Sequence, residues 1–378
     1  MKTKAVVAIQ RCDTYQKEEL DAAMSVVCQH AHMPSVQGKR VLLKPNILSD
    51  AHPDKALTTR AEVLGSLIRY LTKEGAKEVL VGDSPGISGP NFTAKHSGIA
   101  QVCDQEGATW CDFNASYRMH SIPNVKNLQL PLPLILDEVD LVFSVAKMKT
   151  HQLMYATGAV KNLFGLVIGL HKSACHLKFP TRHSFARMLG GLYERIQPDW
   201  ALMDAVVAME GPGPAAGLPR HMGLLLSSND LTALDAAQAL IMGYNPHDIP
   251  LLKELLAKKL TLWDSLEEIS YPLLHANDLV CSDYKRIEIS RKRELLNLPI
   301  PLPFVRSMGL RKQKKEPKPL FDPLVCIGCG KCVEICPSHA LHLDKHHKVV
   351  ADYKACIRCY CCHEVCPVDA ITIGKREA

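Results

Sequence analysis

The sequence lacks any uncharged apolar stretch that approaches the roughly twenty residues needed by a membrane-spanning helix. The best candidate, residues 153–170, contains Lys161 and Asn162. The first nine residues favour a β-strand, and Arg11 follows before the apolar core of a signal peptide could form. We therefore expect no membrane span, no secretion signal and a cytoplasmic protein.

The two common glycine-rich nucleotide-binding motifs are also missing. Residues 82–86, Gly-Asp-Ser-Pro-Gly, match neither the G-x-x-x-x-G-K-S/T phosphate loop nor the G-x-G-x-x-G dinucleotide motif. Glycine and proline at these positions also suit an ordinary turn. We therefore assign no nicotinamide or flavin cofactor.

Positive charge is modest, with a formal net charge of +6 over 378 residues. Basic residues gather in one stretch: Arg306, Arg311, Lys312, Lys314, Lys315 and Lys318. No aromatic residues alternate with them, as they do on surfaces that bind nucleic acid. We interpret the stretch as a solvated linker and expect no nucleic-acid partner.

Six of the fifteen cysteines are scattered without paired spacing: Cys12, Cys28, Cys103, Cys111, Cys175 and Cys281. This distribution favours buried free thiols in a reducing compartment over a disulfide framework. The other nine cysteines all lie between Cys326 and Cys366.

Eight of those nine form two copies of a C-x2-C-x2-C-x3-C-P run, thirty residues apart. Three cysteines at this spacing can wrap around a cubane cluster, and the last cysteine of each run then ligates the other cluster. Pro337 and Pro367 prevent the helix from continuing at that crossing cysteine. The sequence therefore predicts two 4Fe-4S clusters, one held by Cys326, Cys329, Cys332 and Cys366 and the other by Cys356, Cys359, Cys362 and Cys336.

Zinc is the main alternative, since C-x2-C pairs also form zinc ribbons. Two runs of four that each end in Cys-Pro favour iron. Cys361 breaks the repeat, and we interpret it as a spare thiol. Residues 340–343 and 349–350 favour a short hairpin over the clusters. The segment 319–375 resembles a bacterial-type ferredoxin with two 4Fe-4S clusters.

The first 290 or so residues alternate strand-like and helix-like stretches. Strands are expected at 5–9, 40–43, 78–81, 141–145, 201–203 and 224–227, and helices at 17–31, 60–74, 185–195, 231–242 and 251–262. Gly75 stands where the helix 60–74 would end. This alternation predicts an α/β fold with a mostly parallel sheet covered by helices. We expect an α/β domain over 1–298, a proline-rich and basic linker over 299–318, and a small α+β ferredoxin-like domain over 319–378.

Parallel sheets bind ligands beyond the carboxyl ends of their strands. Polar or charged residues follow four of the predicted strands: Lys44-Pro45-Asn46, residues 82–86, residues 146–151, and Asp204. Lys147 and Lys149, with Lys161 nearby, would repel one another unless an anion or carboxylates neutralise them. We predict an anion-binding pocket for a phosphate or carboxylate. The alternative is that these lysines are surface side chains and that His151 is structural.

Several of these motifs resemble the DUF362 family: Val41-Leu-Leu-Lys-Pro-Asn46, Thr58-Thr-Arg60, Gly82-Asp-Ser-Pro85, Lys147-Met-Lys-Thr-His151, Lys161-Asn-Leu-Phe-Gly165 and Asp204-Ala-Val206. The resemblance spans about residues 4–290. This uncharacterised domain is often joined to ferredoxin-like modules. The resemblance implies a cytoplasmic iron-sulfur protein but no settled reaction.

Three functions are open at this point. The first is an oxidoreductase in which the clusters exchange electrons with an anionic small molecule, held by Lys44, Asn46, Lys147, Lys149, Lys161 and Asn162. His151, Asp83 and Asp204 are its candidate proton-transfer residues, and an intrinsic pKa near 6.5 favours His151. The second is a ferredoxin-type electron carrier whose large domain docks a redox partner protein. The third is a maturation factor for another metalloprotein.

Overall fold

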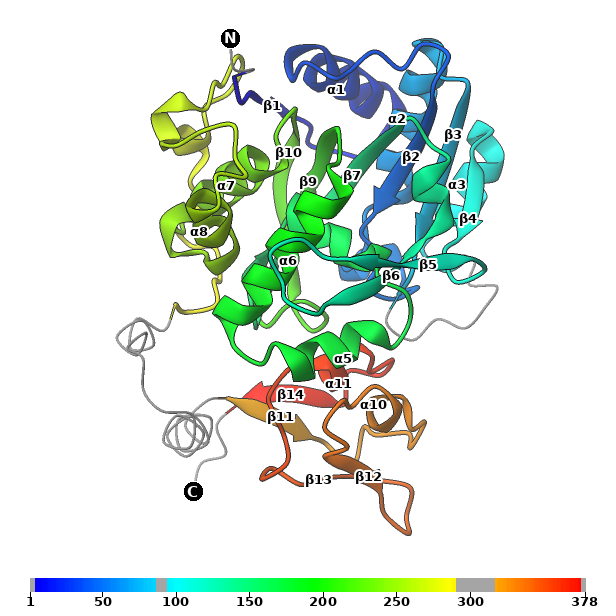
Figure 1. The fold of residues 1–378 in the computed structure, drawn as a ribbon, viewed down its shortest axis with the longest axis vertical. Helices are drawn as coiled ribbons and strands as arrows, with labels where there is room; N and C mark the ends of the chain where they lie inside the picture. Colours follow the sequence, from blue (N-terminus) through cyan, green and yellow to red (C-terminus); the bar gives the residue numbers. More distant parts are fainter. Residues whose placement is uncertain (1–3, 86–93, 290–316, 375–378) are drawn as a thin grey trace.

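The computed structural model describes residues 4–85, 94–289 and 317–374. They form a large α/β domain and a small C-terminal module, which lies below the large domain in Figure 1, next to helix α5 (His171–Lys178). The predicted boundary at residue 298, nearly all of the predicted linker 299–318, and Gly86 lie outside the described residues. No helix in the described ranges is long and apolar enough to cross a membrane.

A mixed sheet forms the centre of the large domain. In the described residues it contains eight strands: β1 (Val7–Arg11), β2 (Arg40–Pro45), β3 (Glu78–Asp83), β4 (Thr109–Asp112), β7 (Leu141–His151), β8 (Tyr155–Thr157), β9 (Trp200–Glu210) and β10 (Leu218–Ser228). The order is β1-β10-β9-β7-β2-β3-β4, and β8 pairs with β7. Strands β9, β7, β2, β3 and β4 are parallel, whereas β10 is antiparallel to both neighbours. The predicted mostly parallel sheet is confirmed.

Helices cover both faces of this sheet: α1 (Lys17–His30), α2 (Ala61–Lys73), α3 (Ile99–Glu106), α6 (Arg182–Ile196), α7 (Leu231–Ile241) and α8 (Pro250–Ala257). On β2, Val41 and Leu43 belong to the apolar core shared with α1, α2 and α3. Leu42, between them, belongs to the opposite core, which contains α6, α7 and α8. Because side chains alternate along a strand, the apolar run of β2 fills both layers.

Helix α2 shows how local sequence sets an element. Its buried apolar residues recur every three or four positions: Val63, Leu64, Leu67, Ile68 and Leu71. This spacing places them on the one face that packs against the sheet. Gly75 follows the helix with a φ of 82°, the left-handed conformation common after helix ends. The predicted helix and its stop are confirmed.

Two strands are longer than predicted. The residues after Val145 and Met203 were expected to be loops, but β7 continues to His151 and β9 to Glu210. Every residue of β7 is buried. Its charged side chains are compensated by groups on neighbouring segments, so they do not force the chain out of the sheet. The two loop predictions are therefore wrong. The predicted helix 251–262 also ends early, at Ala257.

Short elements connect these layers. They are the hairpin β5 (Tyr117–Ser121) and β6 (Gln129–Pro133), the short helix α4 (Ala159–Asn162), and 3-10 turns at Pro53–Lys55, Leu134–Asp137, Leu163–Leu166, Pro246–Asp248, Leu266–Glu268 and Ala276–Leu279. The β5–β6 hairpin was not predicted from the sequence. Helix α5 lies on the side of the large domain that faces the module (Figure 1).

The module is a duplicated unit built from β11 (Lys318–Phe321), α10 (Lys331–Glu334), β12 (Leu341–Leu343), β13 (Val349–Ala351), α11 (Cys361–Glu364) and β14 (Ile371–Gly374). β12 and β13 form the predicted hairpin, and β11 pairs with β14. The repeat extends to the backbone, because Cys326 N–H donates to Asp322 O and Cys356 N–H donates to Asp352 O, both at 3.0 Å. Matching turns therefore precede each cysteine run.

Candidate functional site

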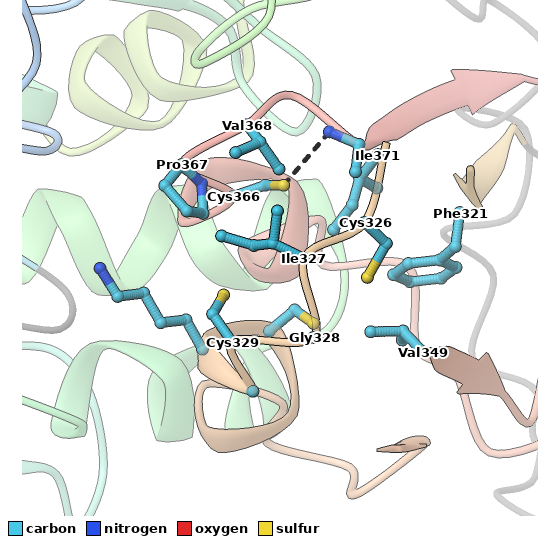
Figure 2. Close-up of a pocket in the computed structure, with 14 residues that line it drawn as sticks. Phe321, Cys326, Ile327, Gly328, Cys329, Val349, Cys366, Pro367, Val368 and Ile371 are labelled. Carbon is cyan, nitrogen blue, oxygen red and sulfur yellow. Dashed lines mark hydrogen bonds between the residues drawn. The ribbon is translucent and has the colours of Figure 1, made fainter. Parts of the chain in front are cut away.

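Four cysteines from both halves of the module surround one cavity of about 370 Å³. Cys326, Cys329 and Cys332 come from the first run, and Cys366 reaches the same cavity from the second (Figure 2). Cys366 follows α11, and the turn after that helix directs it across the module. This grouping is the one that the crossed ligand assignment requires.

The other crossing cysteine, Cys336, packs with the second run. Cys336 lies close enough to Cys356 and Cys362 to influence the pKa of both thiols. Burial raises the pKa of the Cys362 thiol well above its usual value, and the nearby thiols of Cys359 and Cys356 add to this increase. Thiols held this close together are suited to bind a cationic group as thiolates.

The two crossing cysteines also share a backbone environment. Ala340 N–H donates to Cys336 Sγ, and Ala370 N–H donates to Cys366 Sγ, each at 3.3 Å. Hydrogen bonds to ligating sulfurs are one means by which proteins set the reduction potential of a cluster. The duplicated turn therefore gives both sulfurs the same stabilisation.

The first group of cysteines fits an iron-sulfur cluster. A cubane requires four sulfurs distributed around a cavity, and Cys326, Cys329, Cys332 and Cys366 line one. When bound, such clusters supply one-electron transfer.

Cys361 lies beside a predicted ligand but outside both groups of four. It is buried at the start of α11, and its hydrogen bond to Cys359 lowers the pKa of the Cys359 thiol. The equivalent position in the first half is Lys331, which is exposed. The interpretation of Cys361 as a non-ligating thiol stays a prediction.

In the α/β domain, Lys44 and Asp83 form a buried ion pair at the ends of β2 and β3, with 2.9 Å between Nζ and Oδ2. Asp83 also accepts hydrogen bonds from the backbone N–H groups of Ile47 and Ser84, both at 2.7 Å. Asn162 joins the group by donating to Lys44 O at 2.8 Å. Burial raises the pKa of Asp83 and lowers that of Lys44, and the ion pair opposes both shifts.

Lys147 and Asp204 form a second, separate ion pair, with 2.8 Å between Nζ and Oδ2. They are partners in the β7–β9 register and are fully buried. Asp204 also accepts from Tyr15 Oη at 2.9 Å and from Arg60 N–H at 3.1 Å. Its hydrogen-bonding capacity is used within the fold, which favours a structural role for this pair.

His151 is buried as a neutral imidazole. Its Nδ1 accepts from Leu153 N–H at 3.1 Å and Met154 N–H at 3.3 Å, so its proton lies on Nε2. Nε2 is 3.6 Å from Glu364 Oε1, which belongs to α11 of the module. Burial, aided by the charge of Lys161, lowers the pKa of His151 well below its usual value. The intrinsic pKa near 6.5 therefore does not describe His151 in the fold.

A cavity of about 730 Å³ lies between the α/β domain and the module. Five of the predicted residues line it: Lys44, Asn46, Asp83, Lys161 and Asn162. The other four predicted residues, Lys147, Lys149, His151 and Asp204, do not. The structure therefore brings together about half of the predicted site, and it does so at the domain interface.

Several polar groups of this cavity have no hydrogen-bond partner in the described parts of the chain. They are Asn46 Oδ1, Thr157 Oγ1, His176 Nδ1 and Glu364 Oε1. Lys161 likewise has no hydrogen bond or ion pair within those ranges, and burial lowers its pKa. Buried polar groups are normally paired, so unpaired groups around one cavity indicate a place for a polar ligand.

The cavity is also lined by Lys172, His176, Cys361 and Glu364, whose place there was not predicted from the sequence. Lys172 Nζ donates to Ser84 O, and burial lowers its pKa to about 7. Lys172 and His176 are four residues apart, so both lie on the same face of α5. That spacing was visible in the sequence, but nothing there indicated that this face lines a cavity.

Lys149 gives the fold a measurable pH dependence. Burial, more than the nearby charge of Lys161, lowers its pKa from 10.5 to about 7. The folded protein then binds fewer protons than the unfolded chain between these values, so stability rises with pH across that window. We expect the urea unfolding midpoint to rise less between pH 7 and 9 in Lys149→Met than in the parent. Lys73→Met, at an exposed lysine, should retain the parent slope; equal slopes in all three proteins would contradict this prediction.

The fold and the cysteine groups together define an iron-sulfur protein in which an α/β domain is joined to a dicluster module. Comparison with known families agrees. Residues 325–370 match the 4Fe-4S dicluster domain, and residues 41–239 match the domain of unknown function DUF362. The chain belongs to the DUF362 family.

One curated relative is a thylakoid-associated protein of Synechocystis sp. (strain ATCC 27184 / PCC 6803 / Kazusa). It is 31% identical over 253 residues, which cover 67% of this chain and 77% of the relative. Similar solved structures include a Thermotoga maritima protein, 13% identical with a TM-score of 0.37 over 56% of this chain and 55% of that one. The apoprotein of lactate racemase from Thermoanaerobacterium thermosaccharolyticum is also 13% identical, with a TM-score of 0.38 over 58% and 54%. The chain thus spans little more than half of either structure.

Proposed function

We propose that this protein is an iron-sulfur oxidoreductase that exchanges electrons, through two 4Fe-4S clusters, with an anionic small molecule bound between the two domains. The observation that carries the proposal is the composition of the cavity wall. Lys44, Lys161 and Lys172 line one side. Ile335 and Cys361, which line the other, are the chain neighbours of Cys336 and Cys362. A ligand held by the lysines would therefore lie next to the chain neighbours of Cys336 and Cys362, two predicted ligands of the same cluster.

The charges of the cavity favour an anion. Lys44 is compensated by Asp83, and Lys172 lies close enough to Asp83 to benefit from the same carboxylate. The charge of Glu364 influences the pKa of Lys161, but the ion-pair contact that Glu364 makes among the described residues is with His151. An acidic group on the ligand would give the half-buried Lys161 a charged partner.

Hydrogen-bonding groups on the ligand would complete the site. Among the described residues, Thr157 Oγ1 and His176 Nδ1 have no hydrogen-bond partner on the side of the α/β domain. On the side of the module, Glu364 Oε1 has none either, although it lies 3.6 Å from His151 Nε2. A hydroxyl, amide or carbonyl group could pair with them and fix the ligand's orientation. Among the predicted proton-transfer residues, only Asp83 lines the cavity, so it is the one proposed for that role.

The cellular location forms part of the proposal. All fifteen cysteines are free thiols in the structure, including the six outside the module. Free thiols and cysteine-ligated clusters are suited to a reducing compartment. We therefore place the protein in the cytoplasm.

Removing the unpaired lysine tests the site. After anaerobic purification, the parent should retain a small acidic molecule at near-stoichiometric amounts, detectable by mass spectrometry. Lys161→Gln keeps a polar side chain but removes the charge, and it should lower the retained amount at least tenfold, about 1.4 kcal/mol of binding. Its iron and sulfide contents should match those of the parent.

Lys73→Gln provides the matched control, because Lys73 is an exposed lysine in the same domain. It should retain the ligand. The proposal fails if the parent holds no acidic small molecule, or if parent and Lys161→Gln retain it equally.

A further inference from the structure

The duplicated module allows its two cysteine loops to be compared position by position. In the first loop, Leu324, Val325 and Ile327 are exposed to 93%, 44% and 63% of their surface. Thirty residues later, the same positions hold Lys354, Ala355 and a half-buried isoleucine. Both loops have the same predicted role around a cluster, so that role does not explain the difference.

The second loop is the one that faces the α/β domain. Cys361 and Glu364 line the cavity between the domains, and Asp369 forms an ion pair with Lys55 of the α/β domain at 2.9 Å. In the first half, the positions of Cys361 and Glu364 are held by Lys331 and Glu334, which are both exposed. The first loop therefore has no cover from the described part of the α/β domain.

The exposed apolar residues of this loop lie at the first group of cysteines. Ile327 and Cys329 both line the cavity that Cys366 also reaches, as Figure 2 shows. Cys329 is itself exposed, whereas its counterpart Cys359 is half-buried. Contiguous exposed apolar residues often mark an interaction site, because exposing apolar surface to water is unfavourable unless a partner covers it.

The charges that touch this loop are mainly basic. Lys331 lines the same cavity as Ile327, and Lys348 Nζ donates to Cys326 O at 2.6 Å. Within the described ranges, the carboxylate bonded to the loop is Asp322, which accepts from Leu324 N–H at 2.8 Å. Glu334 and Asp344 lie farther along the module, and Asp344 already accepts from His346 N–H and Lys348 N–H. An apolar centre beside two lysines suits an acidic partner surface with an apolar centre of its own.

We propose that Leu324, Val325 and Ile327, flanked by Lys331 and Lys348, form the docking surface for an acidic one-electron carrier protein. We call these five residues the loop surface. Electrons would then enter or leave at the exposed first half of the module, on the side away from the cavity between the domains. This surface does not depend on whether a small molecule binds in that cavity.

The test measures binding of two purified probes to the full-length, cluster-loaded protein: an acidic flavodoxin and basic cytochrome c. The flavodoxin should bind, with an affinity that falls as salt is added, because charge attraction weakens with ionic strength. Leu324→Asp and Lys331→Glu should each raise its Kd at least tenfold. In stopped-flow experiments, both variants should slow electron transfer with flavodoxin while leaving reduction by dithionite unchanged.

Leu262→Asp is the matched control, since Leu262 is a 40% exposed leucine of the α/β domain. It should bind flavodoxin as the parent does. Iron content and visible absorption establish that each variant retains its clusters. The proposal is overturned if the parent does not bind flavodoxin, if cytochrome c binds more tightly, or if Leu324→Asp binds flavodoxin normally. It is equally overturned if sedimentation shows that Leu324→Asp abolishes a dimer, because a second copy of the chain would then occupy the surface.

Discussion

Cys366→Ser should remove about half of the bound iron, from roughly eight to roughly four atoms per chain, with an equal loss of sulfide. The physical reason is the crossed geometry, in which Cys366 shares a cavity with Cys326, Cys329 and Cys332 of the other run. The signal lost in electron paramagnetic resonance should therefore be that of the cluster held by Cys326, Cys329 and Cys332. Iron and sulfide assays after anaerobic purification measure the loss.

Cys361→Ser is the control for this experiment, because Cys361 is a buried cysteine of the same helix region that joins neither group. It should keep the full complement of iron. Cys336→Ser, the symmetric change, should remove the other half. If Cys366→Ser kept its iron and Cys361→Ser lost it, Cys361 would be the ligand and Cys366 the spare thiol. If the parent contained zinc and no sulfide, the assignment of iron-sulfur clusters would be wrong.

The first three cysteines of each run could be placed on one loop from the sequence because their geometry is local, whereas the crossed assignment of Cys336 and Cys366 stays a prediction. Ligands two residues apart must lie on one short loop, and duplication fixes how the two loops face each other. The buried ion pairs were harder to predict from the sequence. Lys147 and Asp204 appeared to follow two separate strands, yet each stands at the same level of the adjacent parallel strands β7 and β9. If the order of the strands had been predicted, Lys147 and Asp204 would have been expected to form an ion pair. These positions would then have been assigned to strands and not to loops.

The position of the cavity could not be predicted, because equivalent residues in the two halves of the module lie in different surroundings. Glu364 lies between the α/β domain and the module, whereas Glu334, its equivalent thirty residues earlier, is exposed. Both glutamates stand two residues after the third cysteine of their runs. The local sequence therefore gave no means of telling which half docks. Docking depends on packing between surfaces far apart in the chain, which neither periodicity nor spacing records.

Asp204→Asn should destabilise the α/β domain by about 3–5 kcal/mol, the usual effect of leaving one member of a buried ion pair without its partner. Lys147 is fully buried, and its ammonium group would keep only Tyr15 Oη, at 3.2 Å, as a hydrogen-bond partner beside the new amide. Burial already lowers the pKa of Lys147, and losing the carboxylate should lower it further. The destabilisation should therefore shrink as pH rises and Lys147 becomes neutral.

Urea unfolding followed by far-UV circular dichroism measures this effect, and two variants separate its causes. Asp283→Asn breaks the Arg220–Asp283 ion pair, whose carboxylate is 71% exposed, and should change stability much less than Asp204→Asn does. The double variant Lys147→Met/Asp204→Leu removes both charges and should recover most of the stability lost in Asp204→Asn, because a buried pair can often be replaced by apolar residues of similar volume. If Asp204→Asn were as stable as the parent but retained less of the bound small molecule, Lys147 and Asp204 would belong to the ligand site and not to the framework that supports it.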